Sequence, residues 1–249
     1  MYFNDVHILY YVVFAIVGGL IGQFVDYCNR CFLKEQKIFS KESFKKYKRI
    51  MIPNYWLIAI MGVGYVCVLY KFGINNEFIK NLDLIKYILL LPMLLCAFVV
   101  DLKEQIIPNR LNLLMLEVGL VFVFLHGFSN INIALNMLLG MLAGGGIFLL
   151  ITLIGGLIAG KEAMGMGDVK LMGALGLYFG IQNIVVISVM SFLIGAIVSI
   201  IYMIVNRKNA DTYIPFGPFI VISSIITIFV PFNILFYVLM KIFTLGMYR

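Results

Sequence analysis

Charged residues are scarce in this sequence, and their scarcity indicates the class of protein. Only 12% of the 249 residues are charged and 63% are hydrophobic, with a mean hydropathy of +1.04. Soluble domains carry about 25% charged residues, so an ordinary soluble domain is excluded. The apolar runs are continuous and do not alternate with polar residues, which argues against a transmembrane β-barrel. We therefore predict an all-α polytopic membrane protein, because helices satisfy their own backbone hydrogen bonds within a bilayer.

Side chains that bind metal ions are also few. The sequence has four cysteines and two histidines. Cys28 and Cys31 form a single C-x-x-C pair, whereas a closed zinc site needs four ligands, commonly from two such pairs. We expect two reduced thiols on a cytoplasmic loop, which leaves this pair as a minor metal candidate. No metal ion or organic cofactor is expected to be required.

Eight apolar runs have lengths typical of membrane helices, since about 20 residues cross roughly 30 Å of hydrocarbon. They cover residues 6–25, 53–70, 84–100, 111–127, 131–159, 184–205, 214–230 and 231–246. A shorter apolar segment, residues 168–182, is either a further crossing or a half-span. Pro231 separates the last two runs, which could instead form one kinked helix. We predict eight transmembrane helices, with nine as the alternative.

The net charge of +7 is concentrated in one loop and indicates the orientation of the chain. Residues 26–52 contain eight Lys or Arg side chains, and the positive-inside rule places such a loop in the cytoplasm. Counting forward puts the loops after residues 100 and 160 on the same side. No nucleic-acid-binding motif accompanies the charge, so we expect contact with the lipid bilayer and none with nucleic acid.

Two aspartates stand at the cytoplasmic ends of apolar segments. Asp101 ends the third run, and Asp168 begins the short segment 168–182. An ionisable residue at the edge of a membrane helix is costly unless it has a partner or a task. Two carboxyl groups that lie close together tend to share one proton near neutral pH. Such a pair can hydrolyse a peptide bond, with one member accepting a proton from water and the other donating a hydrogen bond to the carbonyl.

The stretch GMGDVKLMG also contains two glycines with a physical role. Gly165 and Gly167 allow a sharp turn into a helix and a close approach of a substrate backbone. Asp168 would then lie at a helix N-terminus, which favours the anion and makes it the expected ionised member. An N-cap would explain a single Asp after Gly equally well. The G-x-G spacing lacks the third glycine and the βαβ pattern of a dinucleotide site.

Three segments together resemble the type IV prepilin peptidases. These are VVDLKEQIIPNRLN around Asp101, GMGDVKLMGALGLYFG around Asp168, and YIPFGPFI at residues 213–220. That family consists of membrane aspartic proteases of the GxGD class, which includes archaeal preflagellin peptidases and, more distantly, presenilin-type enzymes. The resemblance covers residues 83–230. It divides the chain into N-terminal membrane helices with the basic loop, residues 1–82, and a membrane aspartic peptidase core, residues 83–249.

The resemblance implies that Asp101 and Asp168 are the catalytic aspartates. Asn109 stands where many members have a second Asp, which singles out Asp101. The residues expected to support the motif and its loop are Gly165, Gly167, Lys170 and Pro108. The implied reaction, which serves type IV pilus assembly and protein secretion, removes a short basic leader from prepilins or related pseudopilins. It takes place at the cytoplasmic face of the inner membrane, typically after a glycine that precedes the substrate's hydrophobic helix.

The cysteines depart from the family pattern. Many members carry two C-x-x-C pairs in an enlarged cytoplasmic loop and also methylate the new N-terminus. Here the loop is short and only Cys28 and Cys31 are present. We therefore expect a peptidase with little or no methyltransferase activity.

A proton- or cation-coupled transporter is the alternative from another functional class. Transporters place ionisable groups near the bilayer midplane, often in repeated halves. Here both aspartates lie at one predicted face and no internal repeat is visible. An inactive scaffold for pilus assembly is a third possibility, and the two intact aspartates count against it. Glu117, inside the fourth run, is a candidate by position, but a buried hydrogen bond to a neighbouring helix, or protonation, is its favoured interpretation.

Overall fold

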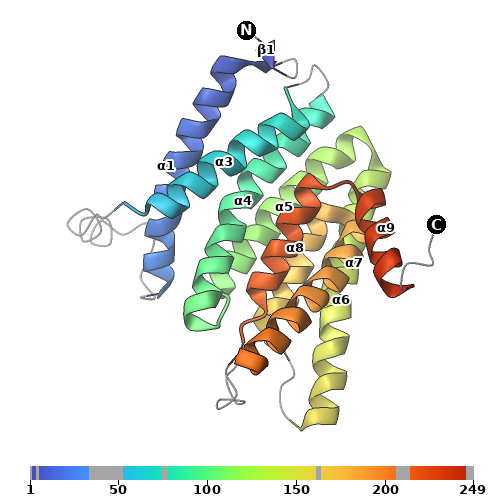
Figure 1. Cartoon of the computed structure of the whole chain (residues 1–249). Helices are drawn as coiled ribbons and strands as arrows, with labels where there is room; N and C mark the ends of the chain where they lie inside the picture. The colour runs from blue at the N-terminus through green and yellow to red at the C-terminus, as the bar shows by residue number, and fades with distance from the viewer. Residues whose placement is uncertain are drawn as a thin grey trace. The chain divides into compact units, whose positions relative to one another are not determined.

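The protein is an all-α multi-pass membrane protein, as predicted. The computed structural model describes residues 2–3, 6–33, 53–74, 78–160, 164–205 and 214–244. Within these ranges six helices are long and apolar enough to cross a bilayer. They are α1 (Ile8–Leu33), α3 (Tyr55–Phe72), α4 (Phe78–Glu104), α5 (Asn109–Ser129), α6 (Ile131–Ala159) and α7 (Met166–Val205), as seen in Figure 1. Two shorter apolar helices follow, α8 (Gly217–Phe229) and α9 (Phe232–Phe243).

The first helix differs from its predicted bounds at both ends. Residues 6 and 7 belong to a short antiparallel strand pair, β1 (Tyr2–Phe3) with β2 (Val6–His7). At the other end α1 continues to Leu33, so residues 26–33 are helical and not part of a loop. The rest of the predicted basic loop, residues 34–52, lies outside the described residues. Apolar content alone placed the end of this helix too early, because polar residues can extend a helix beyond the hydrocarbon.

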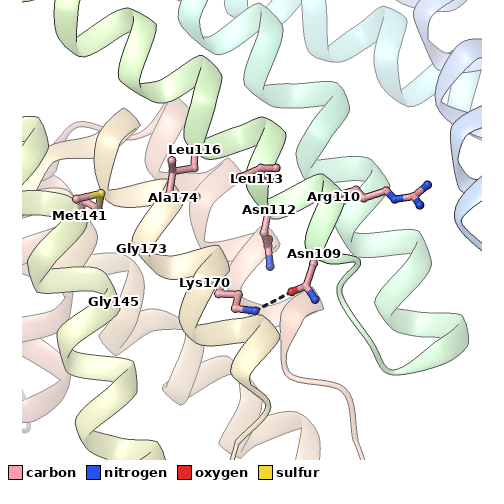
Figure 2. A pocket seen from close by; sticks show the side chains of 10 residues that line it. All are labelled: Asn109, Arg110, Asn112, Leu113, Leu116, Met141, Gly145, Lys170, Gly173 and Ala174. Atoms are coloured by element: carbon pink, nitrogen blue, oxygen red, sulfur yellow. Dashed lines mark hydrogen bonds between the residues drawn. The ribbon is translucent and has the colours of Figure 1, made fainter. Parts of the chain in front are cut away.

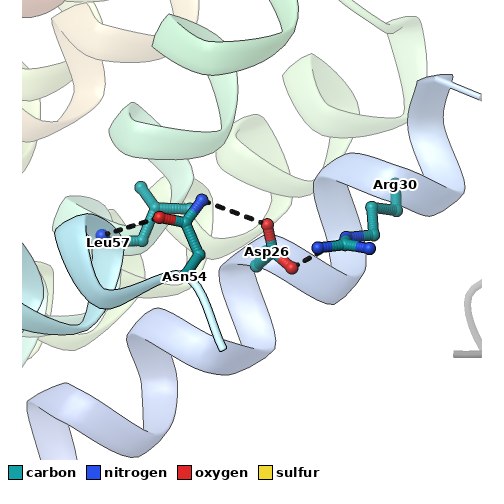
Figure 3. Close-up of polar contacts among 4 residues, drawn as sticks. All are labelled: Asp26, Arg30, Asn54 and Leu57. Carbon is teal, nitrogen blue, oxygen red and sulfur yellow. Dashed lines mark hydrogen bonds and ion pairs between the residues drawn. The ribbon is translucent and has the colours of Figure 1, made fainter. Parts of the chain in front are cut away.

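A buried polar group explains how α1 is extended and joined to α3 (Figure 3). Arg30 Nε donates to Asp26 Oδ2 at 2.8 Å, one helical turn away, and such i,i+4 pairs stabilise a helix. Asn54 Nδ2 donates to the other oxygen of Asp26 at 3.3 Å. Asn54 also caps α3, with Oδ1 accepting from the N–H of Leu57 at 3.5 Å. The buried carboxylate is thereby satisfied, and the start of α3 is held against α1.

The chain divides into two compact units, Met1–Glu104 and Gln105–Arg249. In the first unit α3 packs along α1, and α4 contacts both. Gly18 of α1 makes this packing close, because a Cβ there would lie 2.7 Å from the backbone oxygen of Met61. The functional division after residue 82 stays a prediction, since it rests on activity and these units are defined by compactness.

In the second unit α7 turns back on itself at Gly180, whose backbone is not helical (φ 71°, ψ 177°). The contacts of α6 show the reversal. Gly140 lies against Gly180, and Gly144, one turn further along α6, lies against both Met172 and Ile184. The first arm of α7 therefore runs antiparallel to α6, and the second arm returns beside it.

The length of the first arm answers the question that the sequence left open about residues 168–182. Residues 166–179 extend about 21 Å at roughly 1.5 Å per residue. That distance is short of the roughly 30 Å of hydrocarbon. The segment turns back at Gly180 before it covers that thickness, and both ends of α7 lie at the same end of this unit.

We expect Gly180→Ala to lower stability without changing the helices on either side. The φ and ψ of Gly180 lie in a region that is essentially restricted to glycine, and a Cβ there would lie 2.5 Å from Asn136 Nδ2. The cost should be about 1–3 kcal/mol, seen as a lower thermal midpoint in detergent. Gly127→Ala, where a Cβ would meet only Ala134 Cβ at 3.5 Å, should leave the midpoint near that of the wild type.

The last two apolar runs form separate helices and not one kinked helix. Val230 and Pro231 are both extended, with Pro231 at φ −60° and ψ 145°. The turn lets α9 fold back onto the second arm of α7, where Leu235 and Leu239 pack around Val186. Pro231 has no N–H to continue the α8 hydrogen-bond pattern, which is why the chain breaks there.

Candidate active site

Asp168 is the third residue of α7 and is only 5% exposed. Its backbone N–H donates to the Gly165 carbonyl at 3.1 Å, which closes the turn that begins the helix. A Cβ at Gly165 would lie 3.5 Å from Asp168 Oδ2, so the carboxyl group folds back over this turn. Asp168 is therefore in the first helical turn and is not the N-cap residue. The unpaired N–H groups of a helix N-terminus favour an anion at this place.

The turn before Asp168 is held by the chain segment that begins α5. A Cβ at Gly167 would lie 3.3 Å from Ile107 Cβ, so glycine allows this close approach. Asn112 Nδ2 donates to the Gly167 carbonyl at 3.0 Å. Lys170 Nζ donates to Asn109 Oδ1 at 2.8 Å, the dashed line in Figure 2. The two motif segments, far apart in the sequence, therefore meet through three separate contacts.

Pro108 sets the start of α5 and thereby the direction of both asparagines. It is the N-cap residue, with φ −60° and ψ 130°, and its carbonyl accepts from the N–H groups of Leu111 and Asn112 at 3.0 and 3.2 Å. Proline is well suited to this place because its φ already matches. Deeper in the bundle Tyr178 Oη donates to the Met115 carbonyl at 2.8 Å, which also joins α7 to α5.

Asn112 was not among the residues that the sequence singled out. It is 4% exposed, although it is an amide in a membrane helix. The signal that could have found it is spacing: Asn109 and Asn112 are three residues apart in a helix that starts after Pro108, which puts both on one face.

Asp101 lies in the first unit, one turn before α4 ends at Glu104. Its side chain is 4% exposed, whereas residues 102–106 are all exposed. A buried acidic residue in an otherwise exposed turn is unusual, because Asp is rarely fully buried. Its pairing with Asp168 stays a prediction.

A pocket of about 490 Å³ lies between α5, α6 and α7 (Figure 2). Its lining is mostly apolar, with Lys170 and Asn109 at one end, and Figure 2 shows Arg110 pointing away from them. Lys170 and Ala174 share a face of α7, and at 3.6 residues per turn that face is opposite Asp168. The pocket is therefore separate from the carboxyl group of Asp168.

Two other candidates lie elsewhere. Cys28 and Cys31 were expected on a loop, but both are buried on α1, because that helix continues to Leu33. No group of three His, Cys, Asp or Glu side chains able to hold a metal ion occurs among the described residues. Glu117 is exposed on α5, so the buried hydrogen bond expected for it is wrong.

Comparison with known proteins agrees with this geometry. The model of the type IV leader peptidase family matches residues 88–200, which include both Asp101 and Asp168. The chain is 34% identical over 194 residues to a prepilin leader peptidase/N-methyltransferase of Legionella pneumophila, covering 72% of this chain and 66% of that relative. The chain belongs to the type IV leader peptidase family. The resemblance seen in the sequence is thereby confirmed.

Other members of the family are similar over a shorter stretch. Prepilin leader peptidase/N-methyltransferases of Aeromonas hydrophila and Pseudomonas aeruginosa are 34% and 33% identical over 137 and 132 residues. These matches cover 55% and 53% of this chain. The chain thus spans only 46% and 44% of the lengths of these two relatives, and 66% of the Legionella relative. No solved structure matches the chain.

Proposed function

We propose that this protein is a membrane-embedded aspartic endopeptidase that removes the short basic leader from prepilins or related pseudopilins. The observation that carries the proposal is that the family match includes two acids, Asp101 and Asp168, that are both buried at helix ends. Ionisable residues at the edge of a membrane helix are candidates for a functional site by default. Gly165 supports it further, since the lack of a side chain there leaves the space beside Asp168 Oδ2 open.

In the proposed reaction the two carboxyl groups hold one proton between them. Asp168, at the helix N-terminus, is the ionised member and accepts a proton from the attacking water. Asp101, protonated, donates a hydrogen bond to the oxygen of the scissile carbonyl. The water oxygen bonds to the carbonyl carbon, and the C–N bond then breaks as the proton passes to the leaving amine. The products are a free leader carboxyl group and a new N-terminus.

The proposed place of the reaction is the cytoplasmic face of the inner membrane. The excess of Lys and Arg between residues 26 and 52 supports this orientation. The hydrophobic helix of the substrate would remain in the bilayer, with its basic leader in the cytoplasm. Carboxyl groups at the membrane edge have access to the water that hydrolysis consumes.

We propose little or no methylation of the new N-terminus by this chain. The Legionella relative carries N-methyltransferase in its name, but this chain has a single C-x-x-C pair, which is buried within α1. We therefore expect this chain to cleave the leader without methylating the new N-terminus.

One experiment tests the cleavage and the methylation together. The purified chain in detergent is incubated with a model prepilin and S-adenosylmethionine, and the masses of the products are measured by mass spectrometry. We expect one cut at the junction of leader and hydrophobic helix, without an added methyl group. Proteoliposomes of the same preparation should show no proton or cation flux. An intact prepilin together with measurable flux would favour the transporter and overturn the proposal.

A further inference from the structure

We infer that Asn112 is a positioning residue for the proposed reaction: its buried amide holds the peptide unit that carries Asp168. This inference rests on the proposed function. Asn112 lies on α5, outside the G-x-G-D stretch, and it acts through Gly167 without contact to the substrate. Its role is to keep Asp168 at the place that catalysis requires.

The planarity of the peptide bond makes this hold effective. The carbonyl of Gly167 and the N–H of Asp168 belong to one rigid plane. The carbonyl side accepts from Asn112 Nδ2 at 3.0 Å, and the N–H side donates to the Gly165 carbonyl at 3.1 Å. The carbonyl and the N–H point in opposite directions within this plane, so the two hydrogen bonds together restrict rotation of the peptide unit. Since the Cα of Asp168 is part of that plane, the point from which its carboxyl group extends is restricted as well.

The turn at residues 165–167 needs contacts from outside, because its two glycines have no side chains that could hold its conformation. Gly165 and Gly167 have no side chains and allow more backbone conformations than other residues. The ammonium of Lys170 also joins the turn to α5, but Lys170 is exposed, and water competes for an exposed bond. Asn112 is 4% exposed, so its bond is shielded. The buried amide is therefore the stronger of the two side-chain supports.

Stability alone does not account for an asparagine at this position. Its second polar atom, Oδ1, is buried and has no hydrogen-bond partner in the described part of the chain. A buried acceptor without a partner is unfavourable, and leucine removes it, which offsets part of the cost of leaving the Gly167 carbonyl without its side-chain donor. Leucine at position 112 should therefore be tolerated by the fold. What it removes is the donor to Gly167.

The test compares Asn112→Leu with Asn183→Leu. Asn183 Nδ2 also donates to a backbone carbonyl, that of Phe179 at 3.1 Å, but this bond is local, spans the Gly180 reversal and lies away from Asp168. With a model prepilin, Asn112→Leu should lower kcat by about 10- to 100-fold and change KM by less than about threefold. Its thermal midpoint in detergent should stay close to that of the wild type, because one unsatisfied acceptor is removed while the Gly167 carbonyl loses its side-chain donor. Asn112→Gln, which keeps a donor on a longer arm, should recover part of kcat.

Hydrogen exchange gives a readout that does not depend on activity. Amide protons of the peptide covering residues 164–172 should exchange faster in Asn112→Leu and unchanged in Asn183→Leu. A wild-type kcat in Asn112→Leu, or a fall in kcat that only parallels a loss of folded protein, would overturn the positioning role. Failure of the wild type to cleave any prepilin would instead overturn the proposed function, while the exchange data would still report whether Asn112 holds the turn.

Discussion

Asp168→Asn and Asp101→Asn should each abolish leader cleavage, lowering kcat by at least about 10³-fold. Asparagine has nearly the same size and shape as aspartate, so the buried positions at 4% and 5% exposure remain filled. An amide can neither accept the proton of the attacking water nor share one with a second carboxyl group. The measurement is single-turnover cleavage of a model prepilin by each purified variant.

Two control variants distinguish the loss of a catalytic carboxyl group from the loss of a negative charge in general. Glu104→Gln removes an exposed acid one turn after Asp101, and Glu117→Gln removes an exposed acid on α5. Both should cleave at the wild-type rate, and both aspartate variants should keep the helical circular dichroism spectrum of the wild type. Retained cleavage in Asp168→Asn or in Asp101→Asn would remove that acid from the mechanism. Loss of cleavage in the control variants as well would show that the assay responds to general charge.

Gly176→Ala should cause the largest loss of stability of any single methyl addition in the second unit. A Cβ at Gly176 would overlap the Gly140 backbone carbonyl, and a Cβ at Gly140 would overlap the Gly176 carbonyl. Backbone atoms cannot move aside as a side chain does, so α6 and α7 must separate. We expect a loss of about 3 kcal/mol, measured as a lower thermal midpoint and a lower yield of folded protein in detergent.

Gly146→Ala is the control for this effect. Gly146 lies on the same helix, α6, and a Cβ there would have no neighbour within 4 Å. Alanine is a better helix former than glycine by up to about 1 kcal/mol, so this variant should be as stable as the wild type or more stable. Equal midpoints for Gly176→Ala and Gly146→Ala would show that the helices do not approach each other as closely as the structure has them.

The position of Asp168 follows from the same packing. The first arm of α7 lies against α6 through glycines and against the start of α5 through Ile107, Asn109 and Asn112. A separation of α6 from α7 should therefore also reduce cleavage, through a loss of folded protein and not through the chemistry. The kcat per folded molecule distinguishes this case from that of Asn112→Leu.

The sequence by itself determined the class of fold and the candidate acids. Each long apolar run became a helix, because a bilayer leaves the backbone few other ways to satisfy its hydrogen bonds. The motifs around Asp101 and Asp168 sufficed to identify the family, since their residue types and order are specific. Hydropathy did not locate the end of α1, because its last two turns contain the polar residues Asp26, Asn29 and Arg30, of which Asp26 and Arg30 form an ion pair along the helix.

Only the tertiary structure decided how α7 folds and what holds Asp168. The sequence has 23 glycines, and nothing local distinguishes Gly180, whose positive φ depends on packing against α6 and Asn136. The bond from Asn112 to Gly167 joins residues 55 positions apart. No periodicity within one helix reports such a contact, because it exists only once two helices have packed side by side.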